Sequence, residues 1–325
     1  MRCLVAGTGS IGRRHIQNLV ELLDDCEIVL LRKGGNSDDY SRAIKATIIS
    51  DIGNSLAAGF DLAIIATPTV EHAGVLDILL QARVPVYVEK PVVATTEQLR
   101  RIQERIAISP VMPVTMAGCN LRYLPSLRML KESLKAGLIG TLVRANLQAG
   151  QWLPDWRPQQ DYRESYSADP DKGGGVILDL VHEIDIARWL LGEFDQVKAF
   201  AGKQSSLQID SEDTACILLA NSSSGMMACV SLDYVSRQPV RRYEFVGDKG
   251  TIIWDLHDKA LRLIDPSGVN SLDCGTSGYD VAGTYKVAMT EFIACVREGR
   301  ESSQGIIEGL RSAELAIRIR QVAGL

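Results

Sequence analysis

The sequence lacks the features that mark several classes of protein. No apolar run in it approaches the roughly 18 residues that a helix needs to span a bilayer, and no run of lysine or arginine stands out. Lysine and arginine number 35 against 40 acidic residues, a formal charge of −5, so no basic surface is available for a nucleic-acid backbone. We therefore expect neither a nucleic-acid partner nor a membrane partner.

Disulfide and metal frameworks are also missing. The seven cysteines are odd in number and dispersed, and no two of them form a C-x-x-C pair. This distribution favours reduced thiols over a disulfide framework or a zinc site. Met1 and Arg2 lead directly into a strand-like segment, with a glycine turn following at Gly7, which leaves no room for a signal peptide. We expect a cytoplasmic protein without a metal site.

The length and composition predict two folded domains. The chain has 325 residues, of which 46% are hydrophobic and 23% charged, the balance of a globular protein rather than a disordered one. A chain of this length exceeds what one hydrophobic core usually organises. We place the first domain at residues 1–119 and the second at residues 120–325.

Short apolar runs alternate with helical stretches in the first domain. Near-continuous apolar strands separated by helices indicate a parallel sheet that is covered on both faces. We therefore predict an α/β protein whose N-terminal domain is a doubly wound Rossmann sheet. Its expected strands cover residues 3–6, 27–31, 62–66, 84–88 and 111–117.

The pattern changes after Asn120, where the strands alternate between apolar and polar residues. This alternation predicts an α+β domain built on a large, open, mixed or antiparallel sheet with one bare face. Helices are expected at residues 125–135, 175–191, 285–298 and 306–322, and the last two could pack back on the first domain. Strands are expected at residues 142–148, 196–202, 214–219, 226–233, 241–247 and 250–255.

A glycine-rich loop follows the first expected strand. It reads Gly7-Thr8-Gly9-Ser10-Ile11-Gly12, a G-x-G-x-x-G at a junction between strand and helix. Gly7 allows the tight turn, Gly9 lets a pyrophosphate approach the backbone and Gly12 allows close packing of the helix, whose first N–H groups face the anion. We predict that Gly7, Gly9, Ser10, Ile11 and Gly12 bind a dinucleotide, the alternative being an incidental turn.

The residues after the second expected strand bear on the choice of cofactor. An acidic residue at this point would bind the ribose 2′-hydroxyl of NAD, but the sequence has Arg32 and Lys33, and the first carboxylate is that of Asp38. Two cations suit a 2′-phosphate, so we expect NADP to be preferred over NAD. The alternative is that both cations are solvated surface groups.

Two further segments carry candidate catalytic groups. Glu89 and Lys90 precede Pro91 at a strand end, the edge of the sheet where such folds bind ligands, and an ammonium there could hold a reacting oxygen. Downstream, three glycines lead to Asp179 and His182, which one continuous helix would project from the same face. An imidazole oriented by a carboxylate is a suitable proton shuttle near neutral pH.

Five ordered motifs together resemble the glucose-fructose oxidoreductase, inositol dehydrogenase and rhizopine catabolism family (Gfo/Idh/MocA). They extend over almost the whole chain. The motifs are the glycine loop with Arg13, Arg14 and His15 after it, Ala66-Thr67-Pro68 with His72, Glu89-Lys90-Pro91, Asn120-Leu121-Arg122-Tyr123, and the glycine triplet that leads to His182 and Asp185.

The resemblance implies roles for these residues around a nicotinamide. Lys90 is expected to position and polarise the reacting oxygen, His182 to take or give its proton, and Asp179 to orient the substrate or the imidazole. The cofactor residues expected beyond the glycine loop are Arg32, Lys33, Ala66, Thr67, Pro68, His72, Glu89, Lys90 and Asn120. The expected substrate residues are Arg122, Trp156, Arg157, Tyr162, Asp179 and His182.

The chain departs from the family pattern in one place. His182 follows Asp179 by three residues rather than four, and Val181 stands where a glycine is common. The stretch from residue 151 to 167 resembles a subgroup associated with surface-polysaccharide or sialic-acid-type sugars. Its aromatic residues could stack on sugar faces, or they could form an oligomer contact.

The expected activity is hydride transfer between NAD(P) and a hydroxyl or carbonyl carbon of a sugar, sugar acid or nucleotide sugar. Two alternatives stay open: a hydrolase or lyase that retains its cofactor and oxidises transiently, and a non-catalytic regulatory protein that binds NAD(P). The resemblance also implies a homodimer or homotetramer that assembles through the sheet of the second domain.

Overall fold

The computed structural model describes residues 1–109 and 111–325, which divide into two compact units. The first unit comprises Met1–Cys119 and Tyr285–Glu314, and the second comprises Asn120–Thr284 and Leu315–Leu325. The two-domain expectation placed the boundary at residue 119 and allowed the last two helices to pack back on the first domain. By its contacts, the segment 285–314 lies with the N-terminal residues.

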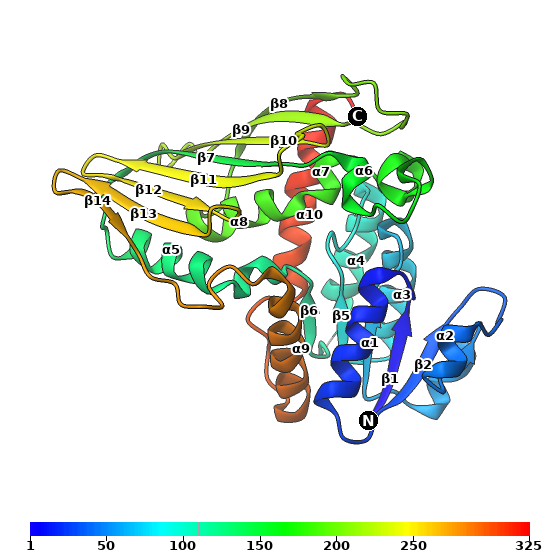
Figure 1. Ribbon diagram of the computed structural model, residues 1–325. Helices are drawn as coiled ribbons and strands as arrows, with labels where there is room; N and C mark the ends of the chain where they lie inside the picture. The colour runs from blue at the N-terminus through cyan, green and yellow to red at the C-terminus, as the bar shows by residue number, and fades with distance from the viewer. Residues whose placement is uncertain (110) are drawn as a thin grey trace. The chain divides into compact units, whose positions relative to one another are not determined.

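The first unit is built on a six-stranded sheet in the order β3-β2-β1-β4-β5-β6 (Figure 1). All five strand pairs are parallel, and β1, β4 and β5 are almost completely buried. This arrangement confirms the prediction of a doubly wound parallel sheet. The strands are β1 (Arg2–Ala6), β2 (Glu27–Leu31), β3 (Thr47–Ile49), β4 (Leu62–Ile65), β5 (Val86–Val88) and β6 (Thr115–Ala117).

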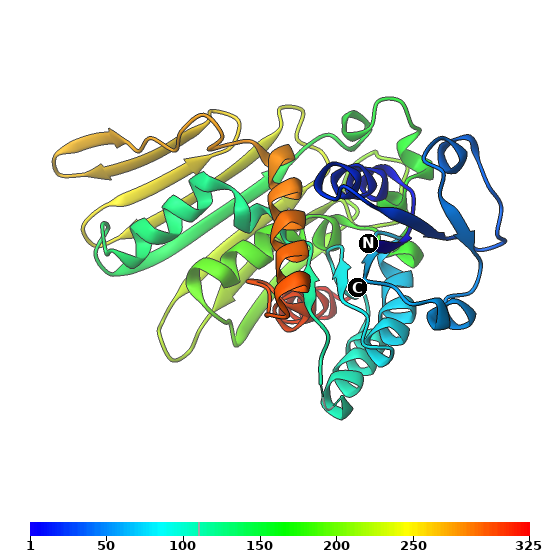
Figure 2. The same cartoon turned by 90° about the horizontal axis from the view of Figure 1, so that it is seen from below.

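Helices cover both faces of this sheet. The chain moves from β1 to β2 in one direction and from β4 through β5 to β6 in the other, so right-handed crossovers put α1 on one face and α3 and α4 on the opposite one. Figure 2 shows the dark-blue helix α1 and the cyan helices α3 and α4 on opposite sides of the strands. The helices of this part of the chain are α1 (Ser10–Leu22), α2 (Asp39–Ala43), α3 (Thr69–Gln81) and α4 (Thr96–Ile108), with the 3-10 turn η1 (Gly53–Ala58).

Two late helices, α9 (Val281–Glu298) and α10 (Ile306–Val322), follow much later in the chain. The segment that joins them closes the outer edge of β6. Ser302 Oγ donates to the carbonyl of Thr115 at 2.6 Å, the amide of Ile306 donates to Thr115 Oγ1 at 3.0 Å, and the amide of Ala117 donates to the carbonyl of Gln304 at 2.9 Å. The last strand of the first sheet therefore depends on residues supplied from the end of the chain.

The second unit contains an eight-stranded sheet in the order β14-β13-β12-β11-β7-β10-β9-β8. The β7–β10 pair is parallel and the other pairs are antiparallel, so the sheet is mixed, as the sequence predicts. The strands are β7 (Leu142–Gly150), β8 (Gln196–Gly202), β9 (Thr214–Ala220), β10 (Met227–Asp233), β11 (Val240–Gly247), β12 (Thr251–Asp255), β13 (Ala260–Asp265) and β14 (Gly268–Ser271).

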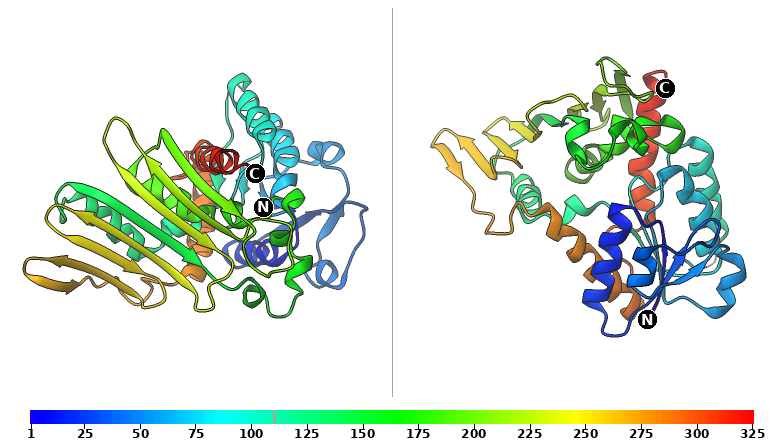
Figure 3. Two further views of the ribbon diagram at one scale, coloured as in Figure 1. Left: turned by 90° about the horizontal axis from the view of Figure 1, so that it is seen from above. Right: turned by 45° about the vertical axis from the view of Figure 1, so that its right-hand side comes forward.

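Helices α5 (Pro125–Lys135), α7 (Val176–Asp179) and α8 (Val181–Leu191) pack on one face of this sheet. The left panel of Figure 3 shows its strands in front of them, with the other face turned to the viewer. That face exposes Phe200, Leu218 and Met227, whose exposed fractions are 86%, 58% and 55%. Short elements in the remaining links are η2 (Asn120–Tyr123), α6 (Leu153–Trp156), η3 (Tyr162–Glu164), η4 (Tyr166–Ala168) and η5 (Pro170–Lys172).

The expectation of one continuous helix over residues 175–191 was wrong. Leu180 has φ −96° and ψ 31°, outside the helical region, and it separates α7 from α8. Every residue from Val176 to Arg188 is buried, so the segment has no polar face whose period could reveal the break. Asp179 and His182 therefore lie on two different helices.

Candidate functional site

The glycine loop forms a tight cradle between β1 and α1. Gly7 has φ +95°, and a Cβ atom there would lie less than 3.0 Å from the carbonyl of Ala66. A Cβ atom at Gly12 would lie equally close to the carbonyl of Gly7, whereas at Gly9 it would meet nothing within 4 Å. No side chain among the described residues caps the start of α1, so its first N–H groups are available to an anion. The loop therefore fits the pyrophosphate of a dinucleotide.

The cradle stands where the strand order of the sheet reverses, between β1 and β4. Open α/β sheets bind ligands at this switch point. Ala66, Thr67 and Pro68 follow β4 directly and lead into α3. Thr67 Oγ1 is buried and has no hydrogen-bond partner within the described part of the chain, so a polar group of a ligand could satisfy it.

The two cations after β2 have different surroundings. Arg32 Nη2 donates to Thr8 Oγ1 in the glycine loop at 3.2 Å, and the guanidinium forms two 3.0 Å contacts with the carboxylate of Asp38. Arg32, together with hydrogen bonds from Ser41, holds the pKa of Asp38 well below its usual range. Lys33 is 87% exposed and pairs with Glu71 at 2.7 Å. Arg32 therefore borders the cradle, while Lys33 is a surface group.

The Glu89-Lys90-Pro91 segment begins where β5 ends, and its Lys90–Pro91 peptide bond is cis. One oxygen of Glu89 lies 2.6 Å from Nε2 of His15, and the other accepts a hydrogen bond from the amide of Lys90 at 3.3 Å. His15 is completely buried in α1, and Glu89 is 6% exposed. The Glu89 carboxylate is thus held by a histidine rather than open to a cofactor.

His72 also contacts the backbone instead of facing outward. It is 1% exposed, and its Nδ1 and Nε2 lie 3.0 Å from the carbonyl of Pro91 and 2.9 Å from that of Thr67. Burial lowers the pKa of His72, while the two carbonyls act in the opposite sense. The imidazole therefore lies between the segment that follows β4 and the segment that follows β5.

In the second unit, Asn120 and Arg122 lie in η2 and are both buried. Nδ2 of Asn120 donates to Thr284 Oγ1 at 2.7 Å, whereas its Oδ1 has no hydrogen-bond partner among the described residues. Arg122 forms a bidentate ion pair with Asp185, with distances of 2.8 and 2.6 Å. Asn120 therefore keeps an acceptor for a ligand, while Arg122, expected to bind substrate, holds Asp185.

Asp179 accepts hydrogen bonds from two tyrosines. The hydroxyl of Tyr234 donates to Oδ2 at 2.7 Å, and that of Tyr166 donates to Oδ1. Burial, together with the nearby carboxylate, raises the pKa of both tyrosines well above its usual value. His182 is 7% exposed and follows on α8. Asp179 and the two tyrosines form a unit that we call the Asp179 cluster.

The glycine triplet is explained by close packing and not by flexibility. A Cβ atom at Gly174 would lie less than 3.0 Å from the carbonyl of Tyr166, and one at Gly175, where φ is +108°, would reach the Glu212 carboxylate equally closely. Glu212 in turn accepts a hydrogen bond from the amide of Ile177 at 3.3 Å. The triplet lets the chain pass between these groups and start α7, which carries Asp179.

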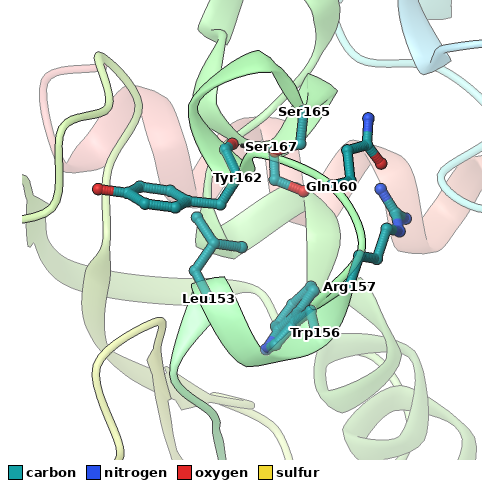
Figure 4. A pocket seen from close by; sticks show the side chains of 7 residues that line it. All are labelled: Leu153, Trp156, Arg157, Gln160, Tyr162, Ser165 and Ser167. Atoms are coloured by element: carbon teal, nitrogen blue, oxygen red, sulfur yellow. Dashed lines mark hydrogen bonds between the residues drawn. The ribbon is translucent and has the colours of Figure 1, made fainter.

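Three expected substrate residues, Trp156, Arg157 and Tyr162, line one small pocket (Figure 4). Trp156 packs edge-on against Tyr234 with ring centroids 5.3 Å apart, and the Arg157 guanidinium lies 5.5 Å from the ring centroid of Tyr166. The pocket residues therefore contact both tyrosines of the Asp179 cluster. The complete lining is Leu153, Trp156, Arg157, Gln160, Tyr162, Ser165 and Ser167.

Sequence reasoning missed three residues that organise these groups. No role was assigned to His15, although it stands in the first motif, and neither Glu212 nor Tyr234 belongs to a recognisable pattern.

Within residues 1–109 and 111–325, no three His, Cys, Asp or Glu side chains are grouped so that they could hold a metal ion. Of the helices described, none combines the length and the apolar character needed to cross a membrane.

Family models match most of the chain. A model described as the oxidoreductase family with an NAD-binding Rossmann fold matches residues 1–116, and one described as the GFO/IDH/MocA C-terminal domain matches residues 127–253. Inositol 2-dehydrogenase of Acidothermus cellulolyticus is 25% identical over 318 residues, which cover 95% of this chain and 88% of the relative. The rhizopine catabolism protein MocA of Rhizobium meliloti is 27% identical over 244 residues, 70% of this chain and 69% of the relative.

Solved structures share the fold along the whole chain. Levoglucosan dehydrogenase in complex with NADH and levoglucosan superposes with a TM-score of 0.84 at 19% identity, covering 100% of this chain and 97% of that one. UDP-N-acetylglucosamine 3-dehydrogenase of Acidithiobacillus ferrooxidans superposes with a TM-score of 0.77 at 21% identity, covering 99% and 97%. At these identities the likeness establishes the architecture of both units.

Proposed function

The chain belongs to the Gfo/Idh/MocA family of NAD(P)-dependent oxidoreductases, and we propose that its substrate is a sugar, a sugar acid or a nucleotide sugar. The observation that carries the proposal is the shared edge of the first sheet, where the glycine cradle after β1 and Lys90 after β5 both follow the carboxyl ends of strands. The dehydrogenases named above act on an inositol, an anhydrosugar and a nucleotide sugar.

The proposed roles follow the chemistry of oxidising an alcohol. When bound, the nicotinamide would accept a hydride from the alcohol or donate one to the carbonyl compound. The ammonium of Lys90 holds the reacting oxygen and stabilises negative charge on it. His182 takes the hydroxyl proton when the alcohol is oxidised and returns it when the carbonyl is reduced. Asp179, which accepts hydrogen bonds from Tyr166 and Tyr234, orients the substrate or the imidazole.

The residues that would hold the dinucleotide are the cradle glycines with Ser10 and Ile11, Thr67 through its buried hydroxyl, and Asn120 through its open Oδ1. We also propose that NADP is preferred, because Arg32 borders the cradle beside Thr8. A 2′-phosphate would compete with Asp38 for the guanidinium. Lys33, paired with Glu71 at the surface, contributes little.

The side chains that line the pocket of Figure 4 are the proposed contact surface for the sugar, because the pocket itself has room for only about one water molecule. Trp156 and Tyr162 offer ring faces for stacking, and Arg157 offers a planar cation for a carboxylate or phosphate. Arg163, by contrast, is paired with Asp161. The positive charge of Arg157 therefore favours an anionic sugar derivative over a neutral polyol.

The bare face of the second sheet is the proposed contact between copies of the chain. Phe200 on β8, Leu218 on β9 and Met227 on β10 extend over three adjacent strands and are each more than half exposed. Apolar groups gathered on one face are typical of a protein interface. We expect a homodimer or homotetramer in solution, and Leu218→Lys should reduce the mass measured by light scattering.

A cytoplasmic location suits the seven free cysteines.

The test of the proposed function is a screen of nucleotide reduction. The purified protein, freed of bound nucleotide, is offered NAD+ or NADP+ with polyols, sugar acids and UDP-sugars, and absorbance at the wavelength of the reduced nicotinamide is followed. Lys90→Ala and His182→Ala should each lower kcat by about 100-fold to 10,000-fold, while nucleotide affinity survives. Turnover at the wild-type rate in both variants would contradict the assigned roles.

A further inference from the structure

Two buried histidines of the first unit contact the residues on either side of Lys90. His15 on α1 contacts Glu89, and His72 on α3 contacts Pro91. Neither histidine has a place in the chemistry proposed above, because both are enclosed, with exposed fractions of 0% and 1%. Burying a polar group is costly unless it is hydrogen-bonded, so these contacts need a reason.

The first contact fixes the carboxylate of Glu89. One oxygen lies 2.6 Å from His15 Nε2, and the other accepts from the amide of Lys90. Directly after β6, a Cβ atom at Gly118 would lie only 3.0 Å from this second oxygen. The carboxylate therefore has little room to adopt another rotamer, and it ties the backbone of Lys90 to helix α1.

The second contact begins where β4 and β5 separate. The last bond between these strands runs from the amide of Glu89 to the carbonyl of Ile65 at 2.9 Å. Beyond it, Thr67 and Pro91 each present a carbonyl, and the imidazole of His72 spans the gap between them. Two carbonyls cannot bond to each other, so the diverging segments need a side-chain donor between them. The neutral imidazole carries one N–H, which it donates to one carbonyl while its ring contacts the other.

Both histidines belong to helices whose first turn borders the dinucleotide cradle. Helix α1 starts at Ser10, directly after the glycine loop, and α3 starts at Thr69, directly after Ala66-Thr67-Pro68. We propose that His15 and His72 are positioning residues that hold Lys90 in place against the two cofactor-binding helices. This inference rests on the proposed catalytic role of Lys90. A pre-positioned ammonium avoids the cost of ordering it during the reaction.

The experiment observes Lys90 directly and without substrate. Reductive methylation with 13C-formaldehyde labels the lysines, and Lys90→Arg assigns the dimethylamine signal of Lys90 by NMR. His15→Leu and His72→Leu remove the hydrogen bonds at similar bulk, whereas His15→Gln and His72→Gln keep an N–H donor. Asn18→Leu, a substitution of another buried polar residue on α1, is the matched control.

The expected result separates positioning from folding. The leucine variants should shift the Lys90 signal and its titration and lower kcat on the order of 100-fold. The KM and the affinity for the preferred nucleotide, measured by calorimetry, should change little. The glutamine variants should restore the signal and most of the rate, and Asn18→Leu should alter neither. Turnover is measured with the compound that reduces the nucleotide fastest in the screen described above.

Two outcomes would overturn the proposal: an unchanged Lys90 signal and kcat in both leucine variants, or a loss that follows the thermal midpoint and is not restored by glutamine. A different result would contradict the proposed function and leave this proposal standing. If the Lys90 signal moves in the leucine variants while Lys90→Ala turns over normally, the histidines position a lysine that the reaction does not need.

Discussion

The two units hold their buried polar groups by different means. In the first unit, two imidazoles join backbone carbonyls and one carboxylate around Lys90. In the second, each carboxylate of α7 and α8 has side-chain partners: two phenols for Asp179, Tyr243 and Arg241 for Glu183, and Arg122 for Asp185. The contacts of the first unit fix the position of the residues beside Lys90, whereas those of the second compensate the charge of buried carboxylates. Substitution of these supporting residues should therefore lower mainly activity in the first unit and mainly stability in the second.

The largest expected effect on stability is at the Arg122–Asp185 pair, which is buried on both sides. Asp185→Ala leaves the guanidinium without its carboxylate and should lower the free energy of unfolding by about 3–5 kcal/mol. Urea unfolding followed by tryptophan fluorescence measures this loss. The double variant Arg122→Met with Asp185→Leu is the control, because it removes both charges and should recover most of the stability. A loss as large in the double variant would mean that packing, and not charge compensation, is responsible.

A smaller loss is expected in the Asp179 cluster. Tyr234→Phe removes one hydroxyl from a buried carboxylate and should cost about 1–3 kcal/mol in the free energy of unfolding. Tyr166→Phe removes the other hydroxyl, and a double-mutant cycle should show that the two effects are not additive, since both donors serve one carboxylate. Additive losses would indicate that the tyrosines act through their separate packing contacts.

The comparison also predicts a dependence on pH that arises in the first unit. Burial lowers the pKa of His72 below its ordinary value of 6.5, so the folded protein binds this proton less readily than the unfolded chain does. The stability contributed by neutral His72 is complete above pH 6.5 and is lost as the pH falls toward the lowered pKa. Thermal midpoints measured from pH 8 downward should fall less steeply in His72→Gln than in the wild type. Parallel curves would place the acid sensitivity elsewhere.

The smallest effect is expected at the exposed end of the cradle. Asp38→Asn removes the carboxylate that occupies Arg32 and should raise the affinity for NADP+ relative to NAD+ severalfold, because the guanidinium becomes available to the 2′-phosphate. Paired calorimetric titrations at one ionic strength measure the ratio. Arg32→Ala should move it in the opposite direction, and the same ratio in all three proteins would mean that Arg32 does not contact the nucleotide.

Local patterns predicted the parts of the fold that are locally encoded. Five of the six strands of the first sheet appear as apolar runs, and helix 125–135 has the expected bounds. The three-residue strand β3 and the fully exposed β14 have no such signal. The break at Leu180 was also missed, because a segment that is buried on all sides has no period to interrupt.

The candidate site was predictable as a set of residues but not as a set of contacts. Lys90, His182 and the glycine loop stand in recognisable motifs. Their partners do not: Tyr234 is 55 residues from Asp179, Asp185 is 63 residues from Arg122, and Glu89 is 74 residues from His15. Pairings at such separations depend on the topology of the sheets, which no local window contains. His72, expected to line the cofactor, also contacts the carbonyls of Thr67 and Pro91, and no local pattern indicated these contacts.

The closing of β6 by residues 302–306 also has a consequence for the order of synthesis. When residues 1–119 have emerged from the ribosome, every strand of the first sheet has been made. Thr115 and Ala117 still lack their hydrogen-bond partners in residues 302–306. The entire segment 120–284 is made before those groups emerge. The nucleotide-binding unit is thus the first to begin, but the outer edge of its sheet stays open until residues 302–306 emerge, after nearly all of the second unit has been made.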